Sequence, residues 1–295
     1  MKTIGLVGLG IIGTAFTRNL IEDGFSVVGY DIDPDRVEIL KTAGGLAAAS
    51  AADAADRSDL VITAVASPGA LPAIAGGRQG LTESGRDGLV VVDVSTLPLD
   101  EKEQTRVLLA DHGITLVDCT ISGTGREAEA RELVFMAGGP PDAVAAARSV
   151  LSKLGRAFFD LGAFGNGTKM KFIANLLVGI HTVSTAEALL LAERSGFDLD
   201  QTLEVIGSGV GNSRMWEIRG PMIVGRTYRQ AAAKVSMWVK DTHLIAAFAR
   251  DLEVPTPLLD QACELYEAAE SAGMAEWDAA AVYEVLEGMS PGRER

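Results

Sequence analysis

Short apolar segments alternate with helical patterns over the first 160 residues of the chain. Most of these segments are rich in β-branched residues and nearly continuous in apolarity, which is typical of strands buried on both faces. The predicted strands are Thr3–Leu9, Ser26–Asp31, Leu60–Val65, Leu89–Val94, Thr115–Asp118 and Leu133–Ala137. The predicted helices between them include Gly13–Asp23, Pro34–Ala43 and Leu99–His112. This alternation predicts an α/β domain in which a parallel-rich sheet carries helices on both sides.

The character of the sequence changes after Gly162, where no further strand is predicted. Helical periodicity takes over, with Gly196 ending a long helix and two prolines, Pro255 and Pro257, separating two later ones. The predicted helices are approximately Asn166–Ser195, Asp200–Ile206, Ala231–Asp251, Thr256–Ser271 and Asp278–Glu287. We therefore predict an α/β domain over residues 1–162, a long interdomain helix over 163–195 and an all-α C-terminal domain over 196–295.

A glycine-rich turn follows the first predicted strand and opens a helix. Gly8, Gly10 and Gly13 have G-x-G-x-x-G spacing, and Ile11 and Ile12 lie between the last two glycines. In a Rossmann-type fold the first glycine permits the turn, the second lets the backbone approach a pyrophosphate, and the third lets the helix pack on the strand. The turn therefore predicts dinucleotide binding. A fold of this kind that binds no nucleotide is the alternative.

An acidic residue ends the second predicted strand. Asp31 lies 18 residues after Gly13, close to the spacing of about 20 at which an acidic residue contacts the ribose in such folds. A carboxylate there accepts hydrogen bonds from a ribose diol and repels the 2′-phosphate of NADP. The sequence therefore favours NAD over NADP as the cofactor.

Composition and charge narrow the class of protein. The 295 residues are 47% hydrophobic and 22% charged, the balance of a soluble globular protein. A net charge of −14 repels phosphate backbones, so we expect no nucleic-acid partner. The most apolar stretch, 176–192, contains His181 and Glu187 and is shorter than a bilayer span, so we expect no membrane association. Two cysteines, Cys119 and Cys263, cannot form a disulfide framework, and a reducing cytoplasm is the expected setting.

The junction of the two predicted domains carries a lysine and an asparagine one helical turn apart. Lys171 and Asn175 are at positions i and i+4 of the predicted long helix and therefore share a face, whereas Lys169 points away from it. An isolated lysine on a helix is usually a solvated surface residue. The spacing alone does not separate that interpretation from a catalytic one.

Four segments together resemble the β-hydroxyacid dehydrogenase family, which includes 3-hydroxyisobutyrate dehydrogenase and tartronate semialdehyde reductase. Gly8–Leu20 is similar to its N-terminal pattern, and Asp118–Gly139 aligns without gaps with a substrate segment that usually begins D-x-P-V-S-G-G. The family motif G-x-G-x-x-x-K-x-x-N-N and a late K-D pair are matched by Gly165, Gly167, Lys171, Asn175 and Lys240-Asp241. The similarity spans nearly the whole chain. It implies a domain architecture like that of 6-phosphogluconate dehydrogenase.

The resemblance implies a reversible, NAD(P)-dependent oxidation of a small 3-hydroxy acid to its semialdehyde or keto acid. By analogy Lys171 would be the general acid/base, and Asn175 would hold the lysine or the substrate hydroxyl in register. A lysine does this well only if burial or a neighbouring positive charge lowers its pKa toward neutrality. The family would form homodimers or homotetramers and place its active site between the two domains.

The resemblance also implies which residues bind the substrate and the cofactor. The residues that would grip the substrate carboxylate are Ser122, Gly123 and Thr124. Beside the glycine-rich turn, the residues that would line the nicotinamide side of the cofactor or close over it are Val65, Ala66, Ser95, Thr96 and Lys240.

The chain departs from the family pattern around the expected substrate pocket. Thr124 stands where glycine is usual, Glu127 and Arg131 stand where glycine is frequent, and Ala174 replaces the first of two asparagines. An aromatic residue that is common before the K-D pair is replaced within Ala231–Ala233. Since the lysine and the second asparagine are kept, we expect the family's reaction on an unassigned substrate.

Two other functions stay open on the sequence alone. An imine reductase shares this architecture but usually lacks the lysine, and a scaffold protein would keep the fold without turnover. Arg126 could pair with a second acidic group of the substrate, although a surface position is favoured, and Trp216 and Trp238 are packing residues or border the pocket. The three histidines have no Cys or acidic partner at ligand spacing, so we expect no metal site.

Overall fold

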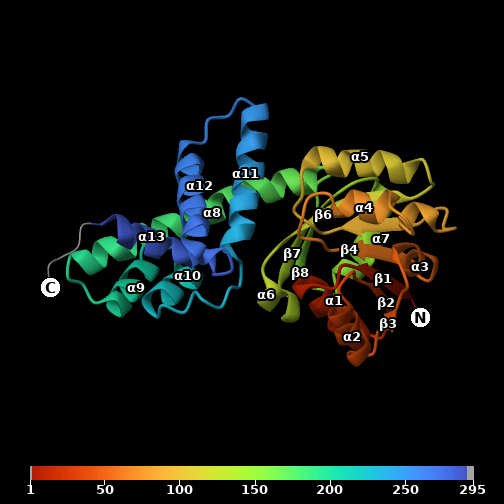
Figure 1. Ribbon diagram of the computed structural model, residues 1–295, viewed down its shortest axis with the longest axis horizontal. Coiled ribbons are helices and arrows are strands. Elements are labelled where there is room, and N and C mark those ends of the chain that lie inside the picture. Colours follow the sequence, from red (N-terminus) through yellow and green to blue (C-terminus); the bar gives the residue numbers. More distant parts are fainter. Residues whose placement is uncertain (1, 291–295) are drawn as a thin grey trace. The chain divides into compact units, whose positions relative to one another are not determined.

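The computed structural model describes residues 2–290, and its internal contacts divide the chain into two units between Lys171 and Phe172. The first unit contains an 8-stranded sheet in the order β3-β2-β1-β4-β5-β6-β7-β8 (Figure 1). The strands are β1 Thr3–Val7, β2 Ser26–Tyr30, β3 Leu46–Ala47, β4 Leu60–Thr63, β5 Val90–Asp93, β6 Thr115–Ser122, β7 Leu133–Gly138 and β8 Gly155–Asp160. The sequence-based expectation of a Rossmann-type, parallel-rich sheet is confirmed, because within residues 2–290 only the β6–β7 strand pair of this sheet is antiparallel.

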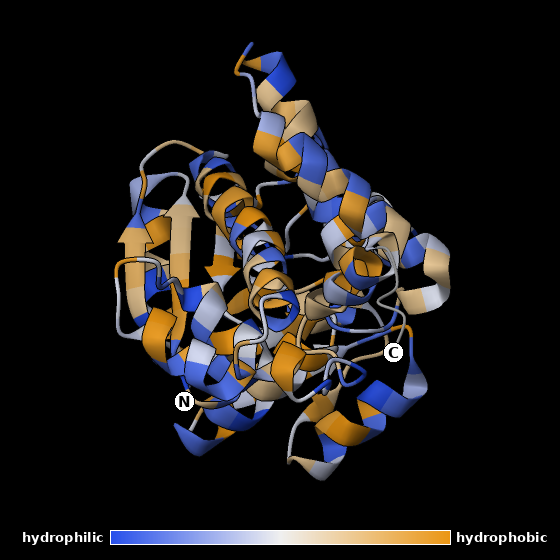
Figure 2. Ribbon diagram, turned by 90° about the vertical axis from the view of Figure 1, so that its left-hand side faces the viewer, coloured by the Kyte–Doolittle hydropathy of each residue, from blue (hydrophilic) through white to orange (hydrophobic). Residues whose placement is uncertain are grey.

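Helices cover both faces of this sheet, as the buried, strongly apolar strands require (Figure 2). They are α1 Ile11–Glu22, α2 Pro34–Thr42, α3 Ala51–Asp56, α4 Ala70–Gly76, α5 Leu99–Ala110, α6 Gly125–Glu129 and α7 Pro141–Leu151, with a short turn of helix at Leu81–Glu83. Two separate cores lie on the two faces. One packs α1 and α7 against the sheet, and the other packs α3, α4 and α5 against it.

Because β1, β4, β5 and β6 run parallel to one another, their carboxyl ends lie at one edge of the sheet. The segments that follow these four strands are therefore neighbours in space, although the sequence separates them by tens of residues. In open sheets of this kind, ligands bind outside the carboxyl ends of the strands, where the strand order reverses. Here that reversal falls between β1 and β4.

In the described part of the second unit, residues 172–290, helices joined by loops are the regular elements. Its elements are α8 Asn166–Arg194 (which begins in the first unit), α9 Leu199–Gly207, α10 Arg214–Val224, α11 Val235–Asp251, α12 Pro257–Ala269, an irregular turn at Glu270–Met274, a short 3₁₀ turn at Ala279–Ala281, and α13 Val282–Met289. Its main core surrounds buried aromatic residues, among them Trp216, Trp238, Tyr228, Tyr266 and Tyr283. The expectation of an all-α second half is met, and residues 291–295 of the predicted C-terminal domain lie outside the described residues.

Helix α8 is long and apolar enough to cross a membrane by length and composition alone. However, 44% of its most apolar window is buried inside the molecule. Val183, Ala186 and Leu189 from this helix pack into the core of the second unit. Helix α8 is therefore a core helix of the second unit.

Several elements differ from the sequence-based prediction. The apolar pattern does not predict β3, which has two residues, or β8, in which three of six residues are exposed and only three consecutive residues are apolar. In the second half it also misses α10. Strand β6 continues beyond its predicted end at Asp118 to Ser122, because it pairs with β7 over that length. Helix α11 begins at Val235 rather than Ala231, because the preceding N–H groups of Ala232 and Ala233 donate to Asp278.

Candidate active site

The glycine-rich turn after β1 requires two of its glycines for steric reasons. Gly8 has φ +94°, and a Cβ there would lie 2.3 Å from the carbonyl oxygen of Ala64. A Cβ on Gly13 would lie 2.2 Å from the carbonyl oxygen of Gly8, so this glycine lets α1 pack directly on the turn. A Cβ on Gly10 would meet nothing within 4 Å, so the backbone there faces open space. The structure thus provides the approach to the α1 N-terminus that a pyrophosphate needs.

Two further residues of the motif, Ile11 and Ile12, form the first turn of α1. Together with Gly13 they have no intrahelical acceptor for their N–H groups, by the geometry of any helix start. Gly10 is the residue before the helix and provides no side chain to cap these groups. The positive end of a 12-residue helix is therefore presented beside the open Gly10 position.

Asp31, at the end of β2, is bonded to the glycine-rich turn itself. Its Oδ2 accepts a hydrogen bond of 2.6 Å from the N–H of Leu9, and its Oδ1 accepts one of 2.9 Å from the N–H of Asp33. The carboxylate is partly exposed, and each oxygen can accept more than one hydrogen bond. Asp31 therefore fixes the turn and still presents a carboxylate at the position where the sequence predicts a contact with the ribose.

The loops after β4 and β5 are joined by side-chain hydrogen bonds. The N–H of Val65 donates to Oγ of Ser95 at 2.9 Å, and that hydroxyl donates to Oδ1 of buried Asp93 at 2.7 Å. Ala66 is exposed and Thr96 is partly exposed beside them. These loops lie at the same sheet edge as the glycine-rich turn, as the sequence-based prediction of a common cofactor site requires.

The predicted substrate segment begins at the carboxyl end of β6, where Ser122 is the last strand residue. Gly123 follows with φ +131° and is exposed. The segment lies against the start of α1, because a Cβ on Gly125 would lie only 2.4 Å from Cγ2 of Ile11. The structure therefore brings Ser122 and Gly123 to the edge that carries the glycine-rich turn.

Thr124 is already engaged by a neighbouring side chain. Its N–H and its hydroxyl both donate to Oε2 of Glu127, at 2.8 and 2.6 Å. Although partial burial opposes the charge on Glu127, the hydrogen bonds from Thr124 lower the pKa of this carboxyl below its usual value. The predicted carboxylate grip thus contains an ionised Glu127 that uses the donors assigned to Thr124.

The start of α8 is anchored on β6. The N–H and hydroxyl of Thr168 donate to the two carboxylate oxygens of Asp118, each at 2.7 Å, and the hydroxyl of Thr120 donates to the carbonyl oxygen of Gly167 at 2.7 Å. Asp118 is fully buried and lies at the positive end of a 29-residue helix. Lys171 is partly exposed and follows Thr168 by three positions. It therefore lies on the same side of α8, one turn further along.

In the second unit, the side chain of Asn175 is held by an acidic residue of α11. Its Nδ2 donates to Oδ2 of Asp241 at 2.9 Å, and both residues are buried. The other carboxylate oxygen of Asp241 lies 3.0 Å from Nζ of Lys240. Asp241 of the K-D pair therefore contacts two side chains: it orients Asn175 and pairs with the adjacent Lys240.

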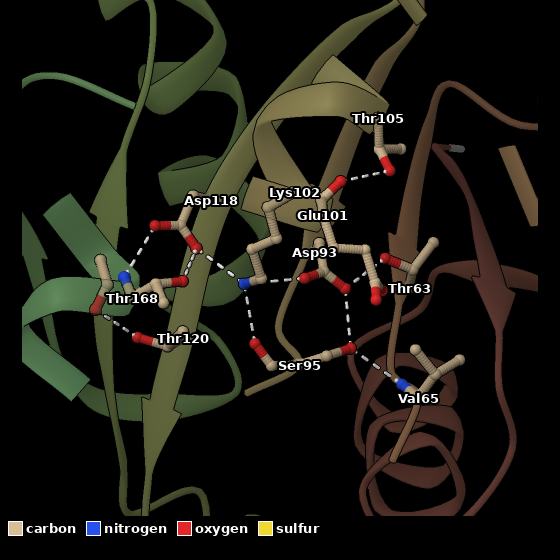
Figure 3. Close-up of polar contacts among 11 residues, drawn as sticks. Thr63, Val65, Asp93, Ser95, Glu101, Lys102, Thr105, Asp118, Thr120 and Thr168 are labelled. Atoms are coloured by element: carbon tan, nitrogen blue, oxygen red, sulfur yellow. Dashed lines mark hydrogen bonds and ion pairs between the residues drawn. The ribbon is translucent and has the colours of Figure 1, made fainter. Parts of the chain in front are cut away.

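Sequence reasoning missed a buried charged cluster beside these loops (Figure 3). Lys102 of α5 is 0% exposed and contacts three oxygens at 2.8 Å: Oδ1 of Asp118, Oδ2 of Asp93 and the carbonyl of Ser95. The strand-terminal positions of the two aspartates were visible in the sequence, but the pattern gave no sign that a lysine of a surface helix would point inward. Only the packing of α5 on the sheet shows it.

The other residues that the sequence analysis considered make contacts typical of surface or core positions. Arg126 is exposed, and Arg131 pairs with Glu22, the last residue of α1, and with Asp23, which follows it. Trp216 donates to the carbonyl of Leu203, and Trp238 stacks on Tyr266, so both are core residues of the second unit. Both cysteines are buried and unpaired, and within residues 2–290 no cluster of three His, Cys, Asp or Glu side chains could hold a metal ion.

The sequence of this chain is similar to known proteins over both of its units. Residues 3–162 match the NAD binding domain of 6-phosphogluconate dehydrogenase, and residues 165–286 match the NAD-binding domain of NADP-dependent 3-hydroxyisobutyrate dehydrogenase. The L-threonate dehydrogenase of Cupriavidus necator is 33% identical over 99% of both chains. The chain belongs to the β-hydroxyacid dehydrogenase family.

Solved structures agree with this family assignment. A 3-hydroxyisobutyrate dehydrogenase from Salmonella typhimurium superposes with a TM-score of 0.87 at 29% identity, covering 97% of this chain and 100% of that one. An imine reductase from Pseudomonas sp. gives a TM-score of 0.62 at 20% identity, covering 97% and 99%, which shows a shared fold alone. As a member of the β-hydroxyacid dehydrogenase family, the chain is an NAD(P)-dependent oxidoreductase of hydroxy acids, as its motifs predict.

Proposed function

We propose that the protein is an NAD-dependent dehydrogenase that reversibly oxidises a small 3-hydroxy acid to its semialdehyde or keto acid. The observation that carries this proposal is the pair Lys171 and Asn175 on one face of α8, with Asn175 held by buried Asp241. A helix anchored at its first turn and an amide fixed by a carboxylate provide a preorganised proton-transfer site. A solvated surface lysine would need neither feature.

The residues around the glycine-rich turn fit a dinucleotide. The open space at Gly10 and the helix start at Ile11, Ile12 and Gly13 would hold the pyrophosphate, and Gly8 permits the turn that exposes them. Asp31 would accept from the adenosine ribose, and its carboxylate disfavours a 2′-phosphate, so we propose NAD rather than NADP. The residues assigned to the nicotinamide side are Val65, Ala66, Thr96 and Lys240. When bound, the dinucleotide exchanges a hydride with the substrate carbon.

Lys171 is the proposed general acid/base. In the oxidation its amine takes the proton from the substrate hydroxyl as the hydride leaves the adjacent carbon, and in the reduction its ammonium returns the proton to the new alkoxide. Asn175 orients the lysine or the hydroxyl, because its own amide donor is fixed by Asp241. The rest of the protein then has to keep these groups in register and exclude competing water.

Ser122, Gly123 and Thr124 are the proposed residues for the substrate carboxylate. The hydroxyl of Ser122 and the exposed backbone at Gly123 lie at the sheet edge that carries the cofactor residues. Because Glu127 already takes both donors of Thr124, the substrate has to displace this carboxylate or bind beside it. An anionic Glu127 favours substrates that offer a hydroxyl group as a donor near the carboxylate. L-Threonate, the acid after which the L-threonate dehydrogenases are named, offers such a hydroxyl group.

The organisation of the protein completes the proposal. We assign dinucleotide binding to residues 1–162, a connecting role to the helix over 163–195 and the helical partner domain to 196–295. We further propose a cytoplasmic homodimer or homotetramer, with a small hydroxy acid and no nucleic acid or membrane as partners.

A substrate panel tests the proposed function. The purified protein is incubated with NAD or NADP and L-threonate, 3-hydroxyisobutyrate or 2-(hydroxymethyl)glutarate, and in the reverse direction with NADH and small semialdehyde acids, while absorbance at 340 nm is followed. We expect turnover with at least one acid and a higher kcat/KM with NAD than with NADP. Binding of NADH without turnover of any acid would instead support the scaffold function.

A further inference from the structure

Three strand residues at the same register position carry a polar row across the sheet. Thr63 on β4 is level with Asp93 on β5, and Asp93 is level with Asp118 on β6. Residues at one register level of parallel strands point to the same face, which here is the face covered by α5. The hydroxyl of Thr63 donates to Oδ1 of Asp93 at 2.8 Å, so the row is a connected polar group inside an apolar core.

Lys102 joins the two carboxylates of this row (Figure 3). Its three N–H groups are matched by three oxygens, those of Asp93, Asp118 and the Ser95 carbonyl. Burial by itself lowers the pKa of Lys102, but the carboxylates of Asp118 and Asp93 outweigh it and raise this pKa above its usual value. The amine, paired with two carboxylates, is therefore protonated at neutral pH, where an ammonium does not take a proton from a substrate.

The contacts of Lys102 lead in two directions within the first unit. On one side, Asp118 fixes the N–H and hydroxyl of Thr168 and thereby the first turn of α8, which carries Lys171. On the other side, Asp93 fixes the hydroxyl of Ser95, and Ser95 fixes the N–H of Val65 in the neighbouring loop. Every step in this path is a hydrogen bond or ion pair of 2.7 to 2.9 Å.

We infer that Lys102 is a positioning residue of the dehydrogenase, which holds the start of α8 and the loops after β4 and β5 in one fixed arrangement. The roles of Lys171 and Val65 in this inference rest on the proposed function. Without the ammonium, two carboxylates at adjacent strand positions repel each other in a buried environment. Each would then shift, and with it the helix start or the loop that it holds.

The test compares three variants at a temperature at which circular dichroism shows each to be folded. Lys102→Met removes the link. Lys102→Met combined with Asp93→Asn also removes the link but keeps the net charge of the cluster at its native value. Leu151→Ala is the control for lost stability, because Leu151 is fully buried in the core on the opposite face of the sheet from the polar row.

We expect kcat for the preferred hydroxy acid to fall on the order of 10- to 100-fold in both Lys102 variants, while KM changes by less than about threefold. The charge-balanced double variant should recover thermal stability but not kcat. Leu151→Ala should lose stability while its kcat stays within about twofold of the wild type. Recovery of kcat in the double variant, or an equal loss of kcat in Leu151→Ala, would overturn the inference.

Hydrogen exchange measured by mass spectrometry gives a readout that needs no turnover. Lys102→Met should accelerate amide exchange together in 166–170, 64–66 and 95–97, and Leu151→Ala should not. This readout stands even if the wild type oxidises no hydroxy acid, so a failure of the proposed function is distinguishable from a failure of the inference. Acceleration confined to α5 would contradict the positioning role. If Lys102→Met does not fold, the charge-balanced double variant carries both measurements.

Discussion

The side-chain amide of Asn175 donates a 2.9 Å hydrogen bond to Oδ2 of Asp241, and both residues are buried. The two residues are 66 positions apart, on α8 and α11. The bond determines which way the amide points, because an Asn side chain can donate through its nitrogen alone. Its carbonyl oxygen is then the group left to accept a hydrogen bond from Lys171 or a substrate hydroxyl.

This bond predicts a catalytic loss when the amide is removed. Asn175→Leu keeps the branched shape of the side chain but removes the amide that donates to Asp241, while the ion pair of Asp241 with Lys240 stays. We expect kcat to fall on the order of 10- to 100-fold with little change in NADH affinity. Thr182→Val is the matched control, because Thr182 is a buried residue of the same helix that bonds the carbonyl of Val178. Equal kcat values for the two variants would contradict the role of Asn175.

Lys171→Ala tests the proposed general acid/base. We expect kcat to fall on the order of 10²- to 10⁴-fold, because one proton-transfer group is lost, while the dissociation constant of NADH changes by less than about threefold. Stopped-flow absorbance gives the first quantity and fluorescence titration the second. Lys169→Ala removes the same charge two positions earlier on α8 and should leave kcat within about twofold. A retained rate in Lys171→Ala would move the acid/base role to another group.

Asp31→Asn tests the cofactor preference. The substitution removes the charge but keeps an oxygen that can accept from the N–H of Leu9, so the glycine-rich turn stays closed. We expect NADPH to bind more tightly and NADH more weakly, which changes the ratio of their dissociation constants on the order of 10-fold. Asp35→Asn removes an exposed charge nearby in α2 and should leave this ratio unchanged. A wild type that already prefers NADPH would refute the interpretation of Asp31.

Glu127→Gln tests the charge at the predicted substrate grip. The glutamine can still accept a hydrogen bond from Thr124, so the turn is kept and only the charge is removed. Because the anionic substrate no longer faces this carboxylate, KM for the acid should fall, by up to about fivefold at low salt and less at high salt. Glu129→Gln, on the same short helix, removes an exposed charge that pairs with Arg18 and should leave KM unchanged. If both variants behave alike, Glu127 lies outside the substrate site.

Buried tyrosines of the second unit predict a loss of stability at alkaline pH. Burial, and then the hydrogen bond to Glu284, raise the pKa of Tyr228 from 10.0 to about 12 in the folded chain, and burial likewise raises the pKa of Tyr266 and Tyr283. A raised folded-state pKa contributes stability that is fully present below pH 10 and is lost as the pH rises through the folded value.

Urea unfolding measures this effect. The free energy of unfolding should therefore fall between pH 10 and about pH 12. Tyr228→Phe should reduce the slope in that range, whereas Tyr30→Phe, in the sheet of the first unit, is the control. A slope that Tyr228→Phe leaves unchanged would show that Tyr228 does not contribute.

The glycine-rich turn shows how local chemistry makes a site predictable. Gly8 and Gly13 are required because a Cβ at either position would collide with backbone, and a spacing of a few residues is enough to recognise such a turn. Asp31 was found for the same reason, since the end of a strand places it beside the turn. Its bond to Leu9 was not foreseen, because it joins two segments that are 22 residues apart.

The contacts of Glu127 and of the polar row could not be predicted from the sequence. Glu127 was noted only as a departure from a family pattern, and its bonds to Thr124 depend on the turn that α6 makes. The row of Thr63, Asp93 and Asp118 depends on strand register, which no single strand specifies. Strand β8 was missed because its only consecutive apolar residues, Ala157 to Phe159, form a run too short to predict a strand.

The sequence by itself determined the alternation of strands and helices, the helical second half, the nucleotide turn, and the lysine and asparagine on one helix face. All of these depend on periodicity or on spacing within a few residues, where backbone geometry leaves little freedom. The tertiary structure alone decided that Lys102 points inward, that Asp118 anchors α8, and that Asp241 orients Asn175. Those contacts join residues from different elements, and a buried charge finds its partner only when the chain has packed.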